Sequence, residues 1–311
     1  MARYLVTGGA GFIGSNIVEE LVRRGAEVAV LDNFITGKRE NLAPFSGRIE
    51  LIEGDIRDGK ALAVALKGVD FVIHQAALRS VPKSVDDPFS TNDINITGTL
   101  KLLASAKSAG VKRLVYASSS SVYGDVRKFP QRESDVTSPI SPYGVSKLAA
   151  ECYCVTFART FGLETVSLRY FNVFGPRQNP ESKYSAVIPA FLFNMVKGES
   201  PVVEWDGRQA RDFTYVGNVV KANLKACVTP GISGEVFNVA CGTSKSVIDI
   251  VRALNKILKT DVKPRYAPKR SGDVRKTYAD TAKMKRLLKL GRLVQFEEGL
   301  RLTVEWFRKN I

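Results

Sequence analysis

The stretch Tyr4-Leu5-Val6-Thr7-Gly8-Gly9-Ala10-Gly11-Phe12-Ile13-Gly14 decides the fold of this chain. A short apolar run leads into glycines with the spacing Gly8-x-x-Gly11-x-x-Gly14, and an amphipathic segment follows. Glycines at this spacing allow a tight turn, a close approach of backbone to pyrophosphate, and close packing of helix on strand. The amino terminus of the helix offers free N–H groups to the anion. The stretch therefore predicts a strand–turn–helix unit that binds the pyrophosphate of a dinucleotide.

Outward from this stretch, short β-branched runs alternate with amphipathic segments through the first half of the chain. This alternation is typical of βαβ units and predicts an α/β fold with a doubly wound parallel sheet of the Rossmann type. Ligands of such sheets bind beyond the carboxyl ends of the strands. Strands are predicted at Tyr4–Thr7, Glu27–Leu31, Ile49–Glu53, Phe71–His74, Arg113–Ala117 and Glu164–Leu168, and helices near Phe12–Arg24, Lys60–Leu66, Ser90–Ser108 and Tyr143–Phe161.

After Phe171 the alternation loosens, and the next forty residues are rich in Pro, Gly and Asn. Helices are predicted near Val187–Val196, Val216–Lys225 and Val247–Leu258, with a strand at Glu235–Ala240 that returns to the main sheet. We therefore divide the chain into a dinucleotide-binding domain, residues 1–171 with 212–240 returning to it, and a smaller interleaved C-terminal α/β lobe for the substrate, residues 172–211 and 241–311.

The composition predicts a folded chain with an acidic ligand. Of the 311 residues, 44% are hydrophobic, which is enough for a sizeable buried core. The net charge of +15 suits nucleic acid, an anionic membrane or a diphosphate-bearing substrate. Eleven Lys and Arg residues but only two acids, Asp273 and Asp280, fall in Lys263–Arg292. We interpret this basic segment mainly as a solvated helical face.

Metal binding and membrane insertion are not predicted. The chain has four cysteines and a single histidine, His74, and the Cys152-x-Cys154 spacing does not match a zinc or thioredoxin motif. No signal peptide and no apolar stretch long enough for a membrane helix is recognised. We therefore expect a cytoplasmic protein without a metal site or a membrane partner.

Two acidic residues follow predicted strands. Asp32 lies eighteen residues after Gly14, where a carboxylate accepts hydrogen bonds from both adenosine ribose hydroxyls and repels a 2′-phosphate. This position favours NAD over NADP, although Lys38 and Arg39 nearby leave NADP open. Asp55 is placed either at the adenine edge or in an ordinary turn at the end of a strand.

The pair Tyr143 and Lys147 carries the most specific chemistry. Residues at i and i+4 lie on one face of a helix. An ammonium beside a phenol lowers the pKa of the phenol, which then works as a general base near neutral pH. The pair follows the strand Arg113–Ala117 and the run Ser118-Ser119-Ser120-Ser121. A hydroxyl from that run is placed to hydrogen-bond the oxygen that Tyr143 deprotonates.

With these motifs the chain resembles an extended short-chain dehydrogenase/reductase, and within that superfamily a nucleotide-sugar 4-epimerase. The resemblance covers essentially the whole sequence, including Ser141-Pro-Tyr143-Gly-Val-Ser-Lys147, Arg169-Tyr-Phe-Asn172 and Arg270-Ser-Gly-Asp273. It implies an NAD-dependent isomerase. In such an enzyme Tyr143 takes the 4-hydroxyl proton of a UDP-hexose while the C4 hydride passes to NAD⁺. The 4-keto sugar then rotates, and the same hydride returns to its opposite face.

The resemblance also assigns site residues one by one. The implied catalytic residues are Ser119, Tyr143 and Lys147. Ser120 and Ser121 are adjacent in sequence and are the alternatives to Ser119. His74, beside the cofactor residues, is interpreted as a packing residue. The implied cofactor-binding residues are Gly8, Gly11, Phe12, Ile13, Asp32, Asn33, Asp55, Ile56, Gln75, Ala76, Ala77, Asn95, Tyr143, Lys147 and Tyr170. The implied substrate-binding residues are Arg79, Ser119, Ser120, Ser121, Asn172, Val187, Arg211, Arg270, Asp273 and Thr277.

Three observations bear on the sugar. Arg211 and Arg270 suit a diphosphate because a guanidinium donates two parallel hydrogen bonds. Thr277 falls where the family has its gatekeeper, and a small side chain there leaves space for a 2-acetamido group. The run Ala77–Pro88 resembles the subgroup that acts on UDP-N-acetylglucosamine. We therefore predict UDP-N-acetylglucosamine and UDP-N-acetylgalactosamine as substrates, with UDP-glucose and UDP-galactose as further candidates.

Three other functions fit part of the sequence. A 4,6-dehydratase needs an acidic pair beside its catalytic hydroxyl, whereas Ser119 is followed by two more serines. A UDP-glucuronate 4-epimerase or decarboxylase stays open because a basic pocket suits an extra carboxylate. An NAD-bound scaffold for nucleic acid would need stacking aromatics, and the basic segment offers only Tyr266 and Tyr278. We therefore expect no nucleic-acid partner.

The oligomeric state is predicted by resemblance. In the family, the helices that correspond to Ser90–Ser108 and Tyr143–Phe161 pair across a two-fold axis as a four-helix bundle. We therefore expect a homodimer. The alternative is that the apolar outer residues of these two helices face the chain's own core.

Overall fold

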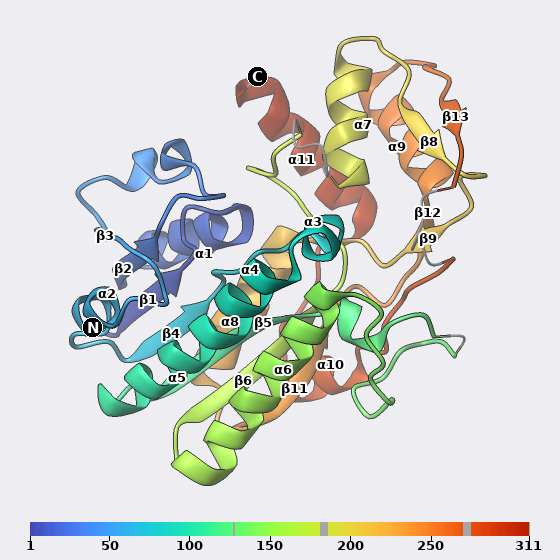
Figure 1. Ribbon diagram of the computed structural model, residues 1–311. Helices are drawn as coiled ribbons and strands as arrows, with labels where there is room; N and C mark the ends of the chain where they lie inside the picture. The colour runs from blue at the N-terminus through green and yellow to red at the C-terminus, as the bar shows by residue number, and fades with distance from the viewer. Residues whose placement is uncertain (127, 181–185, 270–274, 311) are drawn as a thin grey trace.

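The computed structural model describes residues 1–126, 128–180, 186–269 and 275–310. Seven strands form one sheet in the order β11-β6-β5-β4-β1-β2-β3, and every neighbouring pair is parallel (Figure 1). The chain winds outward from β1 in both directions, so the strand order reverses between β1 and β4. A crevice at such a reversal is where ligands bind. The predicted doubly wound α/β fold is confirmed.

Helices cover both faces of the sheet because side chains alternate along each strand. Leu5 packs into the core formed with α2, α5 and α6, whereas the adjacent Val6 packs into the core formed with α1, α8 and α10. The strands are β1 (Arg3–Thr7), β2 (Glu27–Asp32), β3 (Glu50–Glu53), β4 (Phe71–His74), β5 (Arg113–Ser119), β6 (Glu164–Tyr170) and β11 (Glu235–Val239). The helices are α1 (Phe12–Arg23), α2 (Gly59–Ala65), α5 (Thr99–Ser108), α6 (Pro142–Thr156), α8 (Val216–Val228) and α10 (Ala282–Leu288).

The predicted strands are all present, and two are longer than expected. β5 and β6 continue two residues past Ala117 and Leu168, so the first two serines of the serine run belong to a strand. The strand β11 joins the sheet beside β6, as predicted. The helix predicted at Ser90–Ser108 is divided into α4 (Pro88–Asn92), a π-helical segment (Asp93–Gly98) and α5. The helix α6 likewise continues into a π-helical segment, Phe157–Phe161.

One helix of the sheet domain was not predicted. The helix α3 (Val81–Asp86) follows β4 and begins at Ser80, whose side chain accepts a hydrogen bond from the backbone N–H of Lys83. An N-cap serine followed by proline in the first turn is a recognisable start signal. The segment is short and carries a proline, which hid it in the sequence pattern.

A second hydrophobic core lies apart from the sheet, at the upper right of Figure 1. It is formed by α7 (Val187–Val196), α9 (Val247–Leu258) and α11 (Phe296–Asn310). The helix α11 was not predicted, although its buried residues recur at helical spacing. Short paired strands lie at this end of the chain: β7 (Val173–Phe174) with β10 (Thr214–Tyr215), β8 (Val202–Glu204) with β13 (Arg265–Ala267), and β9 (Ala210–Arg211) with β12 (Lys245–Ser246).

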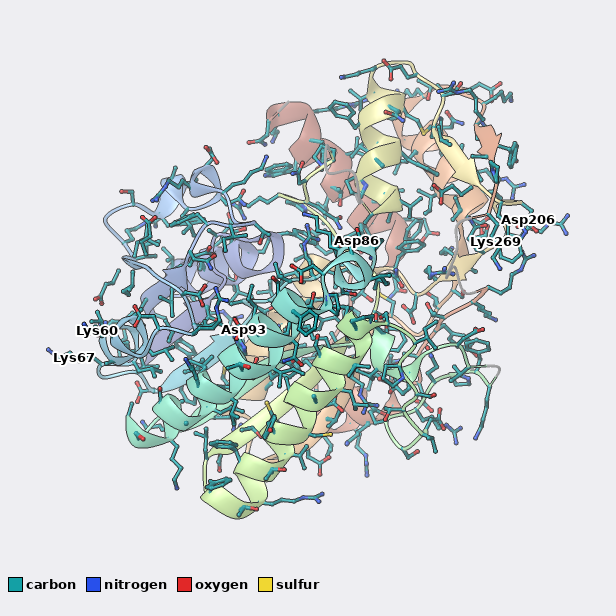
Figure 2. All side chains as sticks on the ribbon, in the orientation of Figure 1. Lys60, Lys67, Asp86, Asp93, Asp206 and Lys269 are labelled. Carbon is teal, nitrogen blue, oxygen red and sulfur yellow. The ribbon has the colours of Figure 1, made fainter. Side chains whose placement is uncertain are left out.

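The charged residues lie largely at the periphery. Figure 2 shows Lys60 and Lys67 projecting from one side of the molecule and Lys269 from the other. Of the described cations in the basic segment, all but Lys283 are exposed. Within the described ranges, no helix is long and apolar enough to cross a membrane, and no three His, Cys, Asp or Glu side chains are grouped to hold a metal ion.

Candidate active site

The glycine turn after β1 is a cradle that only glycine can form. Gly8 has a φ of +68°, and a Cβ atom on it would lie 2.6 Å from the backbone nitrogen of Ala76. A Cβ on Gly14 would lie 2.2 Å from the carbonyl oxygen of Gly8. The helix α1 begins after Gly11, which has no side chain to cap the first N–H groups. These free donors make the turn an anion site of the predicted kind.

Asp32, at the end of β2, ties this turn to the next strand. One carboxylate oxygen accepts the backbone N–H of Ala10 at 2.9 Å, and the other accepts that of Phe34 at 2.8 Å. Burial raises the pKa of Asp32, and the two N–H donors partly offset this rise. Since each ionised oxygen accepts about two hydrogen bonds, one acceptor position per oxygen is left for a ligand hydroxyl. Arg39 is occupied elsewhere, because it pairs with Glu53 at 2.6 Å.

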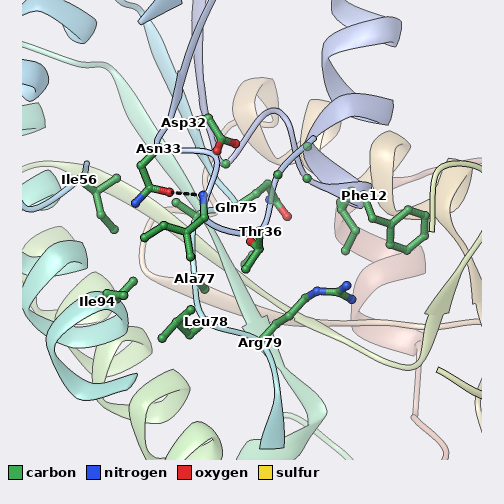
Figure 3. A pocket seen from close by; sticks show the side chains of 18 of the residues that line it. Phe12, Asp32, Asn33, Thr36, Ile56, Gln75, Ala77, Leu78, Arg79 and Ile94 are labelled. Atoms are coloured by element: carbon green, nitrogen blue, oxygen red, sulfur yellow. Dashed lines mark hydrogen bonds between the residues drawn. The ribbon is translucent and has the colours of Figure 1, made fainter. Parts of the chain in front are cut away.

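A pocket of about 1090 Å³, counting the part open to solvent, runs along the carboxyl ends of β1, β2, β4 and β5. Figure 3 shows Asp32 and Arg79 at opposite ends of it in that view, with Gln75 between them. The predicted residues that line it are Gly8, Gly11, Phe12, Ile13, Asp32, Asn33, Asp55, Ile56, Gln75, Ala76, Ala77, Arg79, Tyr143, Lys147 and Tyr170.

Asn95 is the predicted cofactor residue that does not line the pocket. Its side chain is 1% exposed and bonds both backbone groups of Leu78 and the hydroxyl of Ser146. It therefore supports the pocket loop from behind. Sequence reasoning missed several lining residues, because they carry no chemistry that a motif would single out: Leu31, Ile35, Thr36, Gly37, Gly54, Leu78, Ile94 and Ala117.

Asp55 lies in the pocket wall with its acceptor positions filled. Arg57 donates three hydrogen bonds to its carboxylate, from the backbone N–H, Nε and a terminal nitrogen, each at 2.8 Å. Asn33 donates a fourth at 2.8 Å. These hydrogen bonds lower the pKa of Asp55 to about 2. A carboxylate has about four acceptor positions, so Asp55 shapes this end of the pocket mainly by holding Arg57 and Asn33.

Tyr143 and Lys147 project from the first turns of α6. Ser141 caps this helix by accepting the N–H of Gly144 at 3.1 Å, and Tyr143 donates its own N–H to Ser84 of α3 at 3.1 Å. The Lys147 ammonium is 4% exposed and donates to the carbonyl of Ala117 at 2.9 Å. It lies 5.9 Å from the centre of the Tyr143 ring. The helix therefore brings the predicted acid–base pair to the end of β5.

The electrostatics of the pair differ from the sequence-based expectation. Loss of contact with water raises the pKa of Tyr143, while a hydrogen bond to Ser119 and the charge of Arg79 act in the opposite direction. Burial lowers the pKa of Lys147 to about 8. The prediction that Lys147 produces a net lowering of the phenol pKa is therefore wrong for this structure. The groups that favour the phenolate here are Ser119 and Arg79.

The geometry favours Ser119 over its neighbours as the serine that works with Tyr143. Ser119 is the last residue of β5, is 8% exposed, and is the serine of the run that lowers the pKa of the Tyr143 phenol. Its hydroxyl donates to the Ser121 hydroxyl at 3.1 Å and accepts the Ser121 backbone N–H at 3.1 Å. Ser120 and Ser121 lie in the 3₁₀ turn Ser120–Tyr123 that follows.

Two buried side chains, those of Tyr170 and His74, form hydrogen bonds beneath or beside the pocket. The Tyr170 hydroxyl meets the side chains of Gln75 at 3.0 Å and Asn223 at 2.8 Å. Asn223, fully buried on α8, was missed because its sequence neighbours form an ordinary amphipathic helix. His74 bonds Thr7 through Nδ1 at 2.7 Å and Thr99 through Nε2 at 2.9 Å. Burial lowers the pKa of His74 to about 3, which fits a neutral packing residue.

The residues predicted to hold the sugar nucleotide lie on loops and short strands. Asn172 is exposed, and Val187 begins α7. Arg211 is the last residue of β9. The backbone N–H of Thr277 donates to the carbonyl of Ala210, the residue before Arg211, at 3.0 Å. These four residues do not line the pocket described above. Arg270 and Asp273 lie outside the described residues.

Asp212, which follows Arg211 in the chain, joins its own segment to two others. This carboxylate is fully buried and accepts the backbone N–H groups of Cys241 at 3.0 Å, Gly242 at 2.9 Å and Ala279 at 3.3 Å. Burial raises the pKa of Asp212 to about 6. Three segments distant in sequence therefore meet at one carboxylate. Asp212 was not among the predicted site residues.

Comparison with known proteins decides the family. Residues 4–240 match the NAD dependent epimerase/dehydratase family. The chain belongs to this family. It is 38% identical over 309 residues to a putative UDP-glucose 4-epimerase of Methanocaldococcus jannaschii, covering 98% of each. Relatives at 32–34% identity include proteins named as a UDP-glucuronate 4-epimerase and as decarboxylases, so family membership does not select one reaction.

Two solved structures resemble the whole chain. A UDP-N-acetylglucosamine 4-epimerase from Methanobrevibacter ruminantium, in complex with UDP-N-acetylmuramic acid, is 40% identical with a TM-score of 0.95, covering 100% of this chain and 99% of that one. A UDP-glucose 4-epimerase from Thermotoga maritima with UDP-glucose is 41% identical with a TM-score of 0.94, covering 99% of each. The predicted membership of the epimerase group within the extended short-chain dehydrogenases is confirmed.

NAD is the cofactor of this family member, and the pocket fits it. The uncapped turn before α1 suits a pyrophosphate, and the Asp32 carboxylate keeps acceptor positions for ribose hydroxyls. A carboxylate there would repel the 2′-phosphate of NADP, and Arg39 is paired with Glu53. The protein is thus an NAD-dependent enzyme of the epimerase/dehydratase family, and its reaction depends on the groups at the far end of the pocket.

Proposed function

We propose that this enzyme reversibly inverts the 4-hydroxyl of a UDP-hexose. Bound NAD supplies a hydride acceptor for the sugar C4 and returns the same hydride, so that net redox is zero. Tyr143 takes the 4-hydroxyl proton and later gives it back. Ser119 orients that hydroxyl, and Lys147 places a positive charge beneath the phenol. The observation that carries the proposal is the junction of β5 and α6, which brings these three side chains together.

The surroundings of Ser119 favour epimerisation over dehydration. Elimination of water requires an acid–base carboxylate pair beside the catalytic hydroxyl, and Ser119 is followed by Ser120 and Ser121. The carboxylate that does approach the end of β5 is that of Glu151, which is bound by Arg169 at 2.6 Å and by Ser118 at 2.6 Å. A carboxylate held in this way is not free to move protons at the sugar.

The substrate we propose is UDP-N-acetylglucosamine and its 4-epimer, UDP-N-acetylgalactosamine, with UDP-glucose and UDP-galactose as secondary substrates. Thr277 supports the acetamido sugar because its side chain is small and adjoins the strand of Arg211. The Thr277 hydroxyl is buried and has no hydrogen-bond partner within the part of the chain that the structure describes. Arg211, Asn172, Val187, Arg270 and Asp273 are the proposed contacts to the UDP moiety.

A uronic acid is the second candidate, and Arg79 favours it. This side chain lines the pocket with Tyr143, and its charge influences the phenol. A guanidinium close to the reacting carbon C4 suits the C6 carboxylate, which is carried by the neighbouring C5. UDP-glucuronate would then be epimerised at C4, or decarboxylated after oxidation at C4.

The deciding experiment supplies the purified enzyme with UDP-N-acetylglucosamine, UDP-glucose and UDP-glucuronate in separate reactions without added cofactor. We expect NMR to show the 4-epimer of the acetamido sugar as the main product. The 4-epimer of UDP-glucuronate, or carbon dioxide together with a UDP-pentose, would favour the second candidate. The absence of any epimer from all three sugars would contradict the proposed reaction.

We also propose the predicted two-part organisation, with α10 moved from the substrate lobe to the sheet domain on which it packs. We further propose a cytoplasmic location and a homodimer without nucleic acid. For the dimer, the outer face of α3, α4 and α6 exposes apolar side chains, among them Val85 at 63%, Phe89 at 86% and Val145 at 50%. A face of this kind is typical of a protein interface. Light scattering of the wild type and of Phe89→Asp tests it, with a shift from dimer to monomer as the expected result.

A further inference from the structure

Glu151 continues the row of catalytic side chains along α6. Tyr143, Lys147 and Glu151 follow one another at four-residue spacing, which places them on one face of the helix. The Glu151 side chain is 3% exposed, and Arg169 of β6, 5% exposed, binds it through two nitrogens at 2.6 and 3.0 Å. A buried carboxylate is stable only with such a partner. This pair lies outside the pocket and has no part in the chemistry proposed above.

The same carboxylate also holds the end of β5. The Ser118 hydroxyl donates to Glu151 at 2.6 Å, and Ser118 pairs in register with Arg169. The next residue pair in the register is Ser119 with Tyr170. One residue earlier, Lys147 binds the carbonyl of Ala117 at 2.9 Å. The helix α6 therefore fastens two consecutive residues of β5, directly before the serine that meets Tyr143.

We propose that Glu151, held by Arg169, is a positioning residue that sets Ser119 against Tyr143 by fixing Ser118 to α6. The inference rests on the proposed function, because the atoms being positioned are those assigned there. Tyr143 and Ser119 come from different elements, so their separation depends on how α6 sits on β5. A misplacement of about 1 Å at a reacting centre costs roughly 100-fold in rate. The Ser118 hydroxyl is a short, buried link between the two elements.

The chain contains its own control for this inference. Arg113 of β5 and Glu164 of β6 form another ion pair, at 2.6 Å, between residues that are paired in register. It lies at the amino ends of β5 and β6, six residues from Ser119 on β5, which is about 20 Å of strand. Each ion pair includes one residue of β6, and only the pair of Glu151 and Arg169 adjoins the site. A purely structural role predicts similar consequences for both.

The test compares Ser118→Ala with Glu164→Gln in the holoenzyme. Ser118→Ala removes one hydroxyl and leaves the buried ion pair intact, which avoids the unpaired charge that Glu151→Ala would leave. We expect Ser118→Ala to lower kcat by about tenfold or more, with little change in KM or Tm. Ser118→Thr, which keeps the hydroxyl, should recover most of that loss. Glu164→Gln should lower Tm, because it leaves the buried Arg113 without its carboxylate partner, and should leave kcat within about twofold, because the pair is remote from the site.

A second measurement separates this inference from the proposed function. The ultraviolet titration of Tyr143, taken as the difference between each protein and its Tyr143→Phe version, needs no turnover. Because Ser119 lowers the pKa of the Tyr143 phenol, we expect Ser118→Ala to move this titration to higher pH. An inactive wild type would contradict only the proposed reaction. A wild-type titration and wild-type kcat in Ser118→Ala, or an equal loss of kcat in Glu164→Gln, would overturn the positioning role.

Discussion

The cofactor half and the sugar half of this site are built from different kinds of structure. The cofactor half lies at the carboxyl ends of neighbouring parallel strands, where Gly8, Asp32 and Tyr170 are fixed by the sheet register. The sugar half depends on residues such as Arg211 and Thr277, carried by two-residue strands and connections. The cofactor half is held by the continuous hydrogen-bond ladders of the sheet. The sugar half is held by a few side-chain hydrogen bonds, such as those of Asp212.

This difference indicates which half of the site selects the sugar substrate. The turn at the carboxyl end of β1 tolerates little change in sequence, because a Cβ atom on Gly8 or Gly14 would lie less than 3 Å from backbone atoms. The same cofactor frame therefore serves relatives named for different sugars and reactions. The sugar half can vary because its residues are held by side chains and loops. Mutations should accordingly change the common chemistry in the first half and the choice of substrate in the second.

The largest effect is expected at the junction of the two halves. Tyr143→Phe removes the proton acceptor while keeping the ring, so kcat should fall by about 10³-fold or more. Binding of NAD and of the UDP-sugar should be nearly unchanged. Steady-state kinetics with calorimetric measurement of Kd would check this. A loss below about tenfold would mean that another group moves the proton.

In the cofactor half, Asp32→Ala should weaken NAD binding by about 100-fold, the loss of hydrogen bonds to a charged acceptor at about 1.5–3 kcal/mol. It also removes the acceptor that holds Ala10 and Phe34, so Tm should fall. Once saturated with NAD, the variant should keep the sugar preference of the wild type. A changed preference would break the separation of the two halves.

In the sugar half, Thr277→Tyr should reduce kcat/KM for the acetamido sugar by about tenfold or more, since a hydrophobic pocket discriminates by roughly 10–200-fold on size. Turnover of UDP-glucose should be largely kept. Thr277→Ser is the matched control and should resemble the wild type with both sugars. Intact acetamido turnover in Thr277→Tyr, with reduced turnover of UDP-glucose, would show that Thr277 is not the gatekeeper.

The smallest effect concerns the stability of the sugar half. The pKa of Asp212 is about 6 when folded and roughly 3.9 when unfolded. Since the folded chain binds the proton more tightly, this residue favours folding below about pH 4, and that contribution is lost as pH rises through 6. The loss is of the order of 1–3 kcal/mol.

Asp212→Asn cannot titrate, so its unfolding free energy relative to wild type should improve between pH 4 and pH 7. Urea unfolding of both proteins at the two pH values measures the difference. A difference that does not depend on pH would show that the Asp212 carboxyl is not perturbed by the fold. NAD binding should be unaffected, because Asp212 does not line the cofactor pocket.

The sequence predicted the cofactor half well because its signals are local. The glycine spacing, the acid that ends the second strand and the Tyr143–Lys147 pair each read over a few residues. The helices α3 and α11 were not predicted. The helix α3 is short, and in α11 charged residues are interspersed with the buried apolar ones. Asn223 and Asp212 were not assigned roles, because their partners lie on segments that only folding brings near them.

The sequence by itself determined the fold and the cofactor and singled out Tyr143 and Lys147 as the proposed acid–base pair, because these signals depend on spacing within single elements. The tertiary structure decided how that pair is tuned. Burial raises the phenol pKa, and the groups that oppose this rise are Ser119 and Arg79 from two other segments. The tertiary structure also places Glu151 next to the site, where it binds Ser118 of β5 and Arg169 of β6. Desolvation and contacts between distant segments exist only in the folded chain, so no local pattern contains them.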